Sequence, residues 1–541
     1  MKQTASASLS RVALGVLLAL GSSGPALAQE QQVTPPAAPV QEPDSEEIEE
    51  VVVTGRFVSA SQALVNERMT DAFATDLLGA DTIQRLGDST VAFALRRVPG
   101  LSLVQDRFVY IRGLGERYTT TTLNGAAIPS PDLSRNVIPL DVFPTSVVES
   151  LSVQKSYDPS QTANFGGGSV DIRTKGIPDA FTMRLELGTG FNTENPSRVA
   201  TYPGGGDDNL GTDDGSRALS PVISDALVRY QGNPNVNNIF AFERRQDPTF
   251  TQFQAQTINR ELAAALNRDI GVTEESPDPD ITLRGSIGNR FLAGEDWELG
   301  FNVGGNYQST VRWRQTRTAG LGNPEEQTGS REETTHAVNL NGTLNLGAQW
   351  LDDHTISTTT LYLRNTDNET EIFDFFNENR LKSNGRGFRD YRLEFEERSM
   401  FTNQIRGEHY LGRDTRERLP VLDNLLGFLP ELTRFDWYYS TSEANTDIPS
   451  RLDLRSDTVT DRDTGEVLSE AVSLDSFAAD YRFTDLDDEV ENYAYSLTVP
   501  LEFDNSYLEL SGGYDHRRKA RSYYQAQFSG PSRTDWSETS T

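Results

Sequence analysis

The stretch VNLNGTLNLGAQW, residues 338–350, alternates without a break between apolar or small residues and polar ones. Residues 297–306 show the same alternation, and both stretches are long enough to cross a membrane, which takes a strand of ~9–11 residues. One face of such a strand suits lipid and the other suits a wet lumen, because successive side chains point to opposite faces. The pattern therefore predicts the wall of a transmembrane β-barrel.

Further alternating stretches extend this wall. The clear cases are Met183–Phe191, Ile281–Phe291, Phe435–Tyr439, Tyr493–Phe503 and Leu508–Tyr514, and the weaker ones are Thr355–Thr366 and Leu393–Leu411. Together they give nine strands, of which the first rises from the periplasm, so that the ninth ends outside the cell. Single-chain bacterial barrels have even strand numbers. We therefore expect this chain to be the N-terminal portion of a longer barrel.

A soluble β-sandwich is the alternative for these strands, and the connections between them argue against it. Short connections at 293–296, 351–353 and 504–506 alternate with long ones at 192–280, 316–333, 373–390 and 445–489. Short turns on one side and long loops on the other are typical of outer-membrane barrels, whose long loops lie outside the cell. The connection 412–431 is an exception, since it falls on the short-turn side. Trp297 and Trp350 lie beside short turns, as an aromatic girdle at the periplasmic interface requires.

The N-terminus carries the features of an export signal. Residues 1–28 combine basic residues (Lys2, Arg11), an apolar stretch of nine residues and a small-residue end at Ala26–Ala28. A spanning helix needs ~20 apolar residues, so we expect a cleaved secretory signal peptide instead. The following segment, 29–47, is rich in Pro, Gln and acidic residues and too poor in apolar ones to fold.

A small apolar island, IEEVVVT at residues 48–54, follows this unfoldable segment. Its three valines prefer β structure strongly, yet no partner strand lies beside them in the sequence. Such an island can be added as a strand to the sheet edge of another protein, where backbone hydrogen bonds supply affinity. Alternatively, it begins the first strand of the next domain. The residues of the island leave both readings open, and the export signal and the barrel pattern favour the first.

Composition excludes several classes of function. The chain has no cysteine, which excludes thiolate metal sites and cysteine nucleophiles. Its four histidines are widely spaced, which argues against a His-based zinc centre. The net charge of −31 repels nucleic acid. We therefore expect no enzyme activity, no cofactor, no metal site and no nucleic-acid partner.

A compact region at about 65–175 separates the island from the wall. Residues 81–86 and 89–97 read as short helices, with Ser89 as an N-cap and Pro99-Gly100 as a stop. Asn124-Gly125 is a favoured hairpin dipeptide. Short strands are expected at 101–105, 108–112, 119–123, 147–155 and 169–174. These elements predict a small αβ domain.

At this point the chain resembles the TonB-dependent outer-membrane receptors, most specifically over residues 48–175. Residues 47–55, EIEEVVVTG, are similar to the TonB box of that family. The other matching motifs are STVAFALRRVPGL (89–101), VYIRG (109–113), TLNG (122–125), VESLSV (148–153) and FGGGSVDIRT (165–174). Residues 155–159, KSYDP, depart from the family's usual R-G-P. Together with RGLGERYTTTTLNGAAIPSP at 112–131, this departure suggests a subfamily whose ligands need not follow those of the siderophore receptors.

The resemblance implies energised uptake of a scarce ligand, such as a siderophore, haem, a vitamin or an oligosaccharide. The inner-membrane protein TonB would pair with the box and pull, which displaces a plug from the barrel lumen. The implied partners are TonB, the lipid and lipopolysaccharide of the outer membrane, and an unknown small ligand. A secreted or surface β-rich binding protein without active transport is the alternative.

The resemblance also assigns residues and domains. The TonB-binding residues would be Ile48, Glu49, Glu50, Val51, Val52, Val53 and Thr54, and the plug motifs Arg112, Gly113, Asn124, Gly125, Glu149, Gly166, Gly167 and Gly168. We expect Arg112 and Glu149 to tie the plug to the barrel wall, and the three glycines to permit tight turns. The expected domains are a signal peptide (1–28), a disordered periplasmic tail with the box (29–64), a plug (65–176) and the N-terminal part of a barrel (177–541).

The fold expected is thus mainly β, with a small αβ plug inside an antiparallel transmembrane β-barrel that is incomplete in this chain, since the family implies about 22 strands. Segments 192–280 and 446–489 hold fourteen and thirteen acidic residues against seven and four basic ones. Such an excess is typical of solvated loops bridged to lipopolysaccharide by divalent cations. It is also compatible with an acidic vestibule that selects cationic ligands.

Overall fold

The computed structural model describes residues 69, 75–135, 137–157, 165–268, 270–351, 353–420, 426–474, 478–503 and 506–530. The expected signal peptide, the tail and the TonB box lie outside these residues. The described chain is mainly β, with 56% strand and 16% helix, and contains a small αβ domain and a large antiparallel sheet. Among the described helices, none has the length and apolar character needed to cross a membrane.

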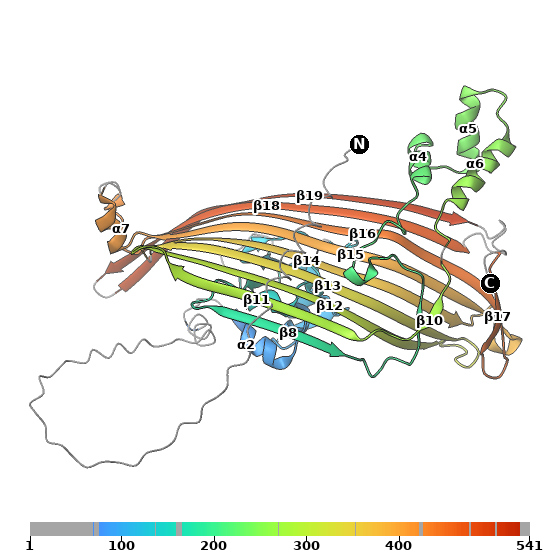
Figure 1. The fold of residues 1–541 in the computed structure, drawn as a ribbon, viewed down its shortest axis with the longest axis horizontal. Helices are drawn as coiled ribbons and strands as arrows, with labels where there is room; N and C mark the ends of the chain where they lie inside the picture. The colour runs from blue at the N-terminus through green and yellow to red at the C-terminus, as the bar shows by residue number, and fades with distance from the viewer. Residues whose placement is uncertain are drawn as a thin grey trace, which may run out of the picture. The chain divides into compact units, whose positions relative to one another are not determined.

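The large sheet is built from nine strands in sequential antiparallel order, and Figure 1 shows them as long, gently curved ribbons. They are β8 (Thr182–Gly190), β11 (Asp280–Leu292), β12 (Trp297–Ala319), β13 (Thr328–Trp350), β14 (His354–Phe375), β15 (Arg386–Tyr410), β16 (Arg434–Thr460), β18 (Ala479–Phe503) and β19 (Ser506–Gly530). A short strand, β17 (Val467–Val472), pairs with the end of β16. Within the described residues β8 and β19 do not pair with each other, so the sheet has two edges.

All nine expected strands are present, but several are much longer than the alternation predicted. Residues 445–489 were expected to form a loop, and this is wrong: β16 continues to Thr460 and β18 begins at Ala479. In the same way, β12 and β13 extend into the expected loop 316–333, and β14 and β15 into 373–390. In these strand ends the apolar residues, such as Leu452, Tyr481 and Phe483, are scattered among many charged ones and pack against the segment between β8 and β11. The alternation is therefore too interrupted to mark the strands in the sequence.

The aromatic girdle forms where the sequence places it. Trp297 and Trp350 are directly paired across β12 and β13, with ring centroids 6.2 Å apart. His354 stacks on Trp350 at 5.2 Å and lies 5.3 Å from His409, which continues the row along β14 and β15. Helix α7 (Arg413–Arg418) lies in the exceptional connection between β15 and β16, at this end of the strands (Figure 1).

The long segment between β8 and β11 contains helices that the sequence did not suggest. It holds β9 (Val199–Thr201), η4 (Asp208–Leu210), α4 (Pro221–Arg229), α5 (Val236–Gln246), α6 (Gln252–Ala264) and β10 (Thr273–Glu275). Three of its aromatic residues, Phe240, Phe242 and Phe250, pack into one cluster around Ile223 and Ile239. These side chains give the segment a small core of its own. Phe253 instead remains 72% exposed.

The small αβ domain carries a five-stranded sheet in the order β1-β6-β7-β4-β5. Its strands are β1 (Thr75–Gly79), β4 (Thr119–Leu123), β5 (Ala126–Ala127), β6 (Val148–Gln154) and β7 (Gly168–Thr174), and a separate hairpin pairs β2 (Leu101–Val104) with β3 (Phe108–Ile111). The helical elements are α2 (Ala80–Leu86), α3 (Val91–Leu95), η1 (Glu116–Tyr118), η2 (Leu140–Val142) and η3 (Thr145–Val147), and a further short turn, η5 (Lys382–Asn384), belongs to the large sheet.

The N-cap of α3 is Thr90, one residue after the expected Ser89. The Thr90 hydroxyl accepts a hydrogen bond from the Phe93 amide at 3.4 Å, which satisfies one of the free amides of the first turn.

Candidate functional site

The small domain is docked on one face of the large sheet. Leu361 and Leu363 of β14, Met400 of β15 and Ala444 of β16 belong to the same buried cluster as the core of the small domain. The register aligns these wall residues across the sheet, because Leu363 pairs with Met400 and Met400 with Ala444. The face that carries them is therefore the inner face, and the face of Trp297 and Trp350 is the outer one.

A buried carboxylate clamps the small domain to the wall. Asp488 of β18 has a fully buried side chain and accepts a hydrogen bond from the Ser130 amide at 2.9 Å. Lys519 Nζ and Arg521 Nη1 of β19 lie 2.9 and 3.1 Å from the same carboxylate. Arg521 also donates to the carbonyl oxygens of Ser130 and Asp132. One carboxylate thus pairs with two wall cations and holds the loop after β5.

A second charged group joins the two parts next to this clamp. Arg398 of β15 is almost fully buried and donates to Asp141 of the small domain at 3.3 Å and to Asp367 of β14 at 2.9 Å. Arg107, on the turn after β2, lies 3.1 Å from Asp141. Two arginines therefore share two carboxylates across the interface. The sequence motifs do not include this group or Asp488. The only sign of them in the sequence is a charged residue at a strand position whose side chain points to the inner face.

The Asn124-Gly125 turn forms as the sequence predicts, between β4 and β5. Both residues have positive φ, 50° and 81°, which this tight hairpin turn requires. The Asn124 side chain donates to Gln404 Oε1 of the wall at 3.1 Å, and Arg406 of the wall donates to the Asn124 carbonyl oxygen. Gly125 N donates to Asp171 Oδ1 at 2.8 Å. The turn is thus held from both sides.

Arg112 and Glu149 were expected to contact the wall, and their described contacts lie in the small domain and at its exit. Arg112 Nη1 donates to the Lys155 carbonyl oxygen at 2.9 Å, within the small domain, and φ is positive at both Arg112 and Gly113. Glu149 Oε2 accepts from the Gly176 amide at 3.3 Å, on the segment that leads into β8. Both side chains therefore fix the backbone of the small domain and its exit.

The three glycines 166–168 serve close packing. None of them is among the residues with positive φ, so the expected role in tight turns is not what requires glycine here. A Cβ on Gly166 would lie 3.0 Å from Tyr118 Cβ, and one on Gly167 3.1 Å from Leu114 Cβ. A Cβ on Gly168 would lie only 2.7 Å from Ile111 Cδ1 and 2.9 Å from Gln154 O. The chain passes directly beneath these side chains as it enters β7.

We expect Gly168→Ala to destabilise the small domain by about 1–3 kcal/mol, because the added methyl overpacks Ile111 and a backbone oxygen. The measurement is the opening free energy of β6 and β7 by hydrogen exchange. Gly342→Ala is the matched control, since a Cβ at Gly342 meets nothing within 4 Å. Equal protection of β7 in both variants would contradict the packing role.

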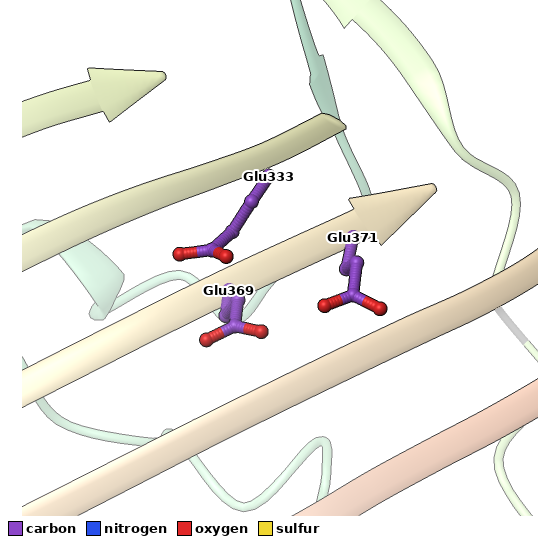
Figure 2. Close-up of side chains that lie close together, drawn as sticks. All are labelled: Glu333, Glu369 and Glu371. Carbon is purple, nitrogen blue, oxygen red and sulfur yellow. The ribbon is translucent and has the colours of Figure 1, made fainter. Parts of the chain in front are cut away.

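Three carboxylates gather on the inner face beyond the docked domain. Figure 2 shows Glu333 on one strand and Glu369 and Glu371 on the next, and one oxygen of each lies within 4.8 Å of the others. Such oxygens are the ligands that hard cations prefer. Arginines already balance two of them: Arg314 Nη2 lies 2.7 Å from Glu333 and Arg331 Nε 3.4 Å from Glu371. The group is therefore largely compensated by the protein itself.

A cavity of about 600 Å³ adjoins this group. Its charged lining consists of Arg331, Arg392, Arg455, Arg482, Glu371, Asp390, Asp453 and Asp480, together with the rings of Phe373 and Phe375. Arg455 pairs with Asp390 at 2.7 Å and Arg392 with Asp453 at 2.8 Å. The size suits a small ligand. The four arginines of the lining balance its four carboxylates. The cavity therefore differs from the acidic vestibule that the composition of segments 192–280 and 446–489 suggested.

The small domain also matches a known family by sequence. The family model described as TonB-dependent Receptor Plug Domain matches residues 67–170. Residues 67–170 are thus similar to the plug domain of TonB-dependent receptors. The docked αβ domain is accordingly the plug, and the large sheet is the wall against which it rests.

Similar solved structures include one transporter and two receptors. The ferric citrate transporter FecA, in its unliganded form, has 12% identity and a TM-score of 0.34, over 87% of this chain and 60% of that chain. The siderophore receptor PiuA from Acinetobacter baumannii has 12% identity and a TM-score of 0.30, over 83% and 62%. The ferric-catecholate import receptor Fiu from E. coli K12 has 10% identity and a TM-score of 0.29, over 84% and 63%.

The chain thus spans about three fifths of the length of these structures, between 60% and 63%. No curated protein matches the sequence.

Proposed function

We propose that this chain belongs to an outer-membrane receptor that takes up a small ligand, with the plug as its gate and TonB as its source of energy. The observation that carries the proposal is the plug domain docked on the inner face of the antiparallel sheet. A plug held by Asp488, Arg398 and Asn124 blocks the space beside the wall, and these contacts are polar and separable. Uptake then requires that some of them open.

The path of the chain supports a pull from the N-terminal side. Strand β1 is the edge strand of the plug sheet and pairs only with β6 among the described strands, whereas β4 and β5 at the opposite edge lie at the wall. Lys155 Nζ donates to Asp76 Oδ2 and to the Pro99 carbonyl oxygen, which fastens β1 to the end of β6. A pull on the residues before β1 therefore meets the least anchored edge first, because local opening costs less than global unfolding.

The location is tested by fractionating cells that express the protein from its own gene. We expect recovery in the outer membrane, because β12 and β13 present an apolar outer face between the girdle and their polar ends. Leu344 and Leu346 of β13 belong to this face and are 39% and 46% exposed. Recovery in the soluble periplasm would refute the receptor and favour a secreted β-rich binding protein.

A further inference from the structure

The segment that joins the plug to the wall runs along the inner face of the wall. It comprises residues 175–181, between the end of β7 and the start of β8, and we call it the exit segment. Three adjacent wall strands bind three successive carbonyl oxygens of this segment. Asn345 of β13 donates to Lys175 O at 3.0 Å, Asn302 of β12 to Gly176 O at 2.8 Å and Arg290 of β11 to Ile177 O at 3.5 Å.

Three glycines of the same strands form a seat for the exit segment. Gly300 of β12 and Gly347 of β13 are paired across the sheet, and Ile177 fills the space where each of them would carry a Cβ. A Cβ at Gly288 of β11 would lie 2.8 Å from Pro178 Cγ. A methyl group at these positions would displace the segment, because a packed interface has no room for it. The wall therefore receives both the backbone and the side chains of the exit segment.

The plug holds the start of the exit segment from the opposite side. The Lys175 amide donates to the Val147 carbonyl oxygen at 3.1 Å, and the Gly176 amide donates to Glu149 Oε2 at 3.3 Å. Lys175 Nζ also donates to the Ser146 carbonyl oxygen. The amides at positions 175 and 176 thus bind the plug, whereas their carbonyl oxygens bind the wall.

The length of the exit segment shows what this seat does to the plug. Seven unattached residues would reach at most about 25 Å, at ~3.3–3.6 Å per residue. The apolar band of an outer-membrane barrel is also ~25 Å tall. An unattached exit segment would therefore let the plug shift as one body through most of the depth of the membrane. The seat removes this slack, because it begins at Lys175, directly after β7.

We propose that the exit segment is a fixed anchor, which stays on the wall while a pull on the N-terminal side opens the plug. A shift of the whole plug would have to break the three carbonyl hydrogen bonds and empty the glycine seat together. Strand β1 is paired only with β6 among the described strands and opens locally at a lower cost. The plug therefore opens strand by strand from β1, and β7 opens last. This inference rests on the proposed receptor function and names the part of the plug that does not move.

The test pulls on the N-terminus of the purified full-length protein with optical tweezers. The protein is held in lipid nanodiscs fixed to a surface, without TonB and without ligand. We expect the plug to be released in steps up to the end of β7, followed by a separate final step of about 2.5 nm for the seven residues of the exit segment. Release of the whole plug in a single rupture, or release of the exit segment before β7 opens, overturns the proposal.

Side-chain variants show whether the wall amides hold the anchor. Asn302→Ala combined with Asn345→Ala should abolish the separate final step, because two of the three carbonyl oxygens lose their donors. Asn341→Ala is the matched control and should keep the step. Asn341 lies on the same face of β13, four residues from Asn345, and its side-chain nitrogen has no hydrogen-bond partner among the described residues. A final step that persists in the double variant contradicts the proposal.

A disulfide tests the anchor without weakening it. The chain has no cysteine, and Ile177 touches the position of a Cβ at Gly300, so Ile177→Cys with Gly300→Cys places two thiols within bonding reach. The bridged protein should release the plug as the parent does up to the end of β7 and lose only the final step, which returns on reduction. A bridge that keeps the plug closed overturns the proposal, since the exit segment would then have to move first. None of these measurements involves TonB capture or fractionation, so the two proposals can fail separately.

Discussion

Val52→Pro should abolish capture of the purified periplasmic domain of TonB by the receptor. If the box at 48–54 is added as a strand to a TonB sheet, its backbone amides supply the ladder of hydrogen bonds. Proline at the middle of the box removes one donor and fixes φ near −65°. We expect the affinity to fall at least about a hundredfold, corresponding to ~3 kcal/mol. The measurement is biosensor binding of the TonB domain to the receptor in detergent.

Two controls separate pairing from other effects of the substitution. Val52→Ile keeps the amide and the β preference, and should bind TonB as the parent does. Gln31→Pro places the same residue in the acidic tail ahead of the box and should also bind normally. Normal TonB capture by Val52→Pro would refute the role of the box.

Asp488→Ala should loosen the plug from the wall by about 3–5 kcal/mol. The substitution leaves Lys519 and Arg521 without their shared carboxylate on a largely buried face, and removes the acceptor of the Ser130 amide. Hydrogen exchange in the loop 126–132 should become about a hundredfold to a few thousandfold faster, because 1.4 kcal/mol corresponds to a factor of ten. Cells should also become sensitive to large antibiotics that the plug excludes.

The control for this prediction is Asp487→Ala, one position earlier on the same strand. Asp487 is exposed and points to the opposite face of β18. Its removal changes the net charge by the same amount but touches none of the clamp contacts, so exchange in the loop should stay within about threefold of the parent. Equal acceleration in both variants would show that charge alone, and not the clamp, controls docking of the plug.

Much of the wall could be predicted from the sequence, because its outer face must be apolar. Strands β13 and β12 were predicted from alternation, and their tryptophans pair as a girdle requires. The far halves of β16 and β18 were not, since their apolar residues, among them Leu452, Tyr481 and Phe483, are scattered among charged ones and pack against the segment between β8 and β11. The helices α4 to α6 were missed for a related reason: they pack into a small cluster of their own within a segment that reads as a loop.

The plug motifs show the same division at the level of single residues. The Asn124-Gly125 dipeptide predicts its turn, because only certain residues tolerate positive φ at two successive positions. The partners of the turn, Gln404 and Arg406, are about 280 residues away and have no local signal. Arg112 and Glu149 belong to the plug motifs and were expected at the wall, and their described contacts are with the plug backbone and its exit.

The sequence by itself determined which segments form most of the strands and turns, because alternation and the hairpin dipeptide act through local backbone geometry and solvent preference. Only the tertiary structure decided which charges meet. Asp488 contacts Ser130 only because the plug is docked on the wall, and Tyr118 packs against Gly166 only because the plug is folded on itself. Such contacts join residues that are far apart in the chain. The sequence around each residue therefore does not indicate its partner.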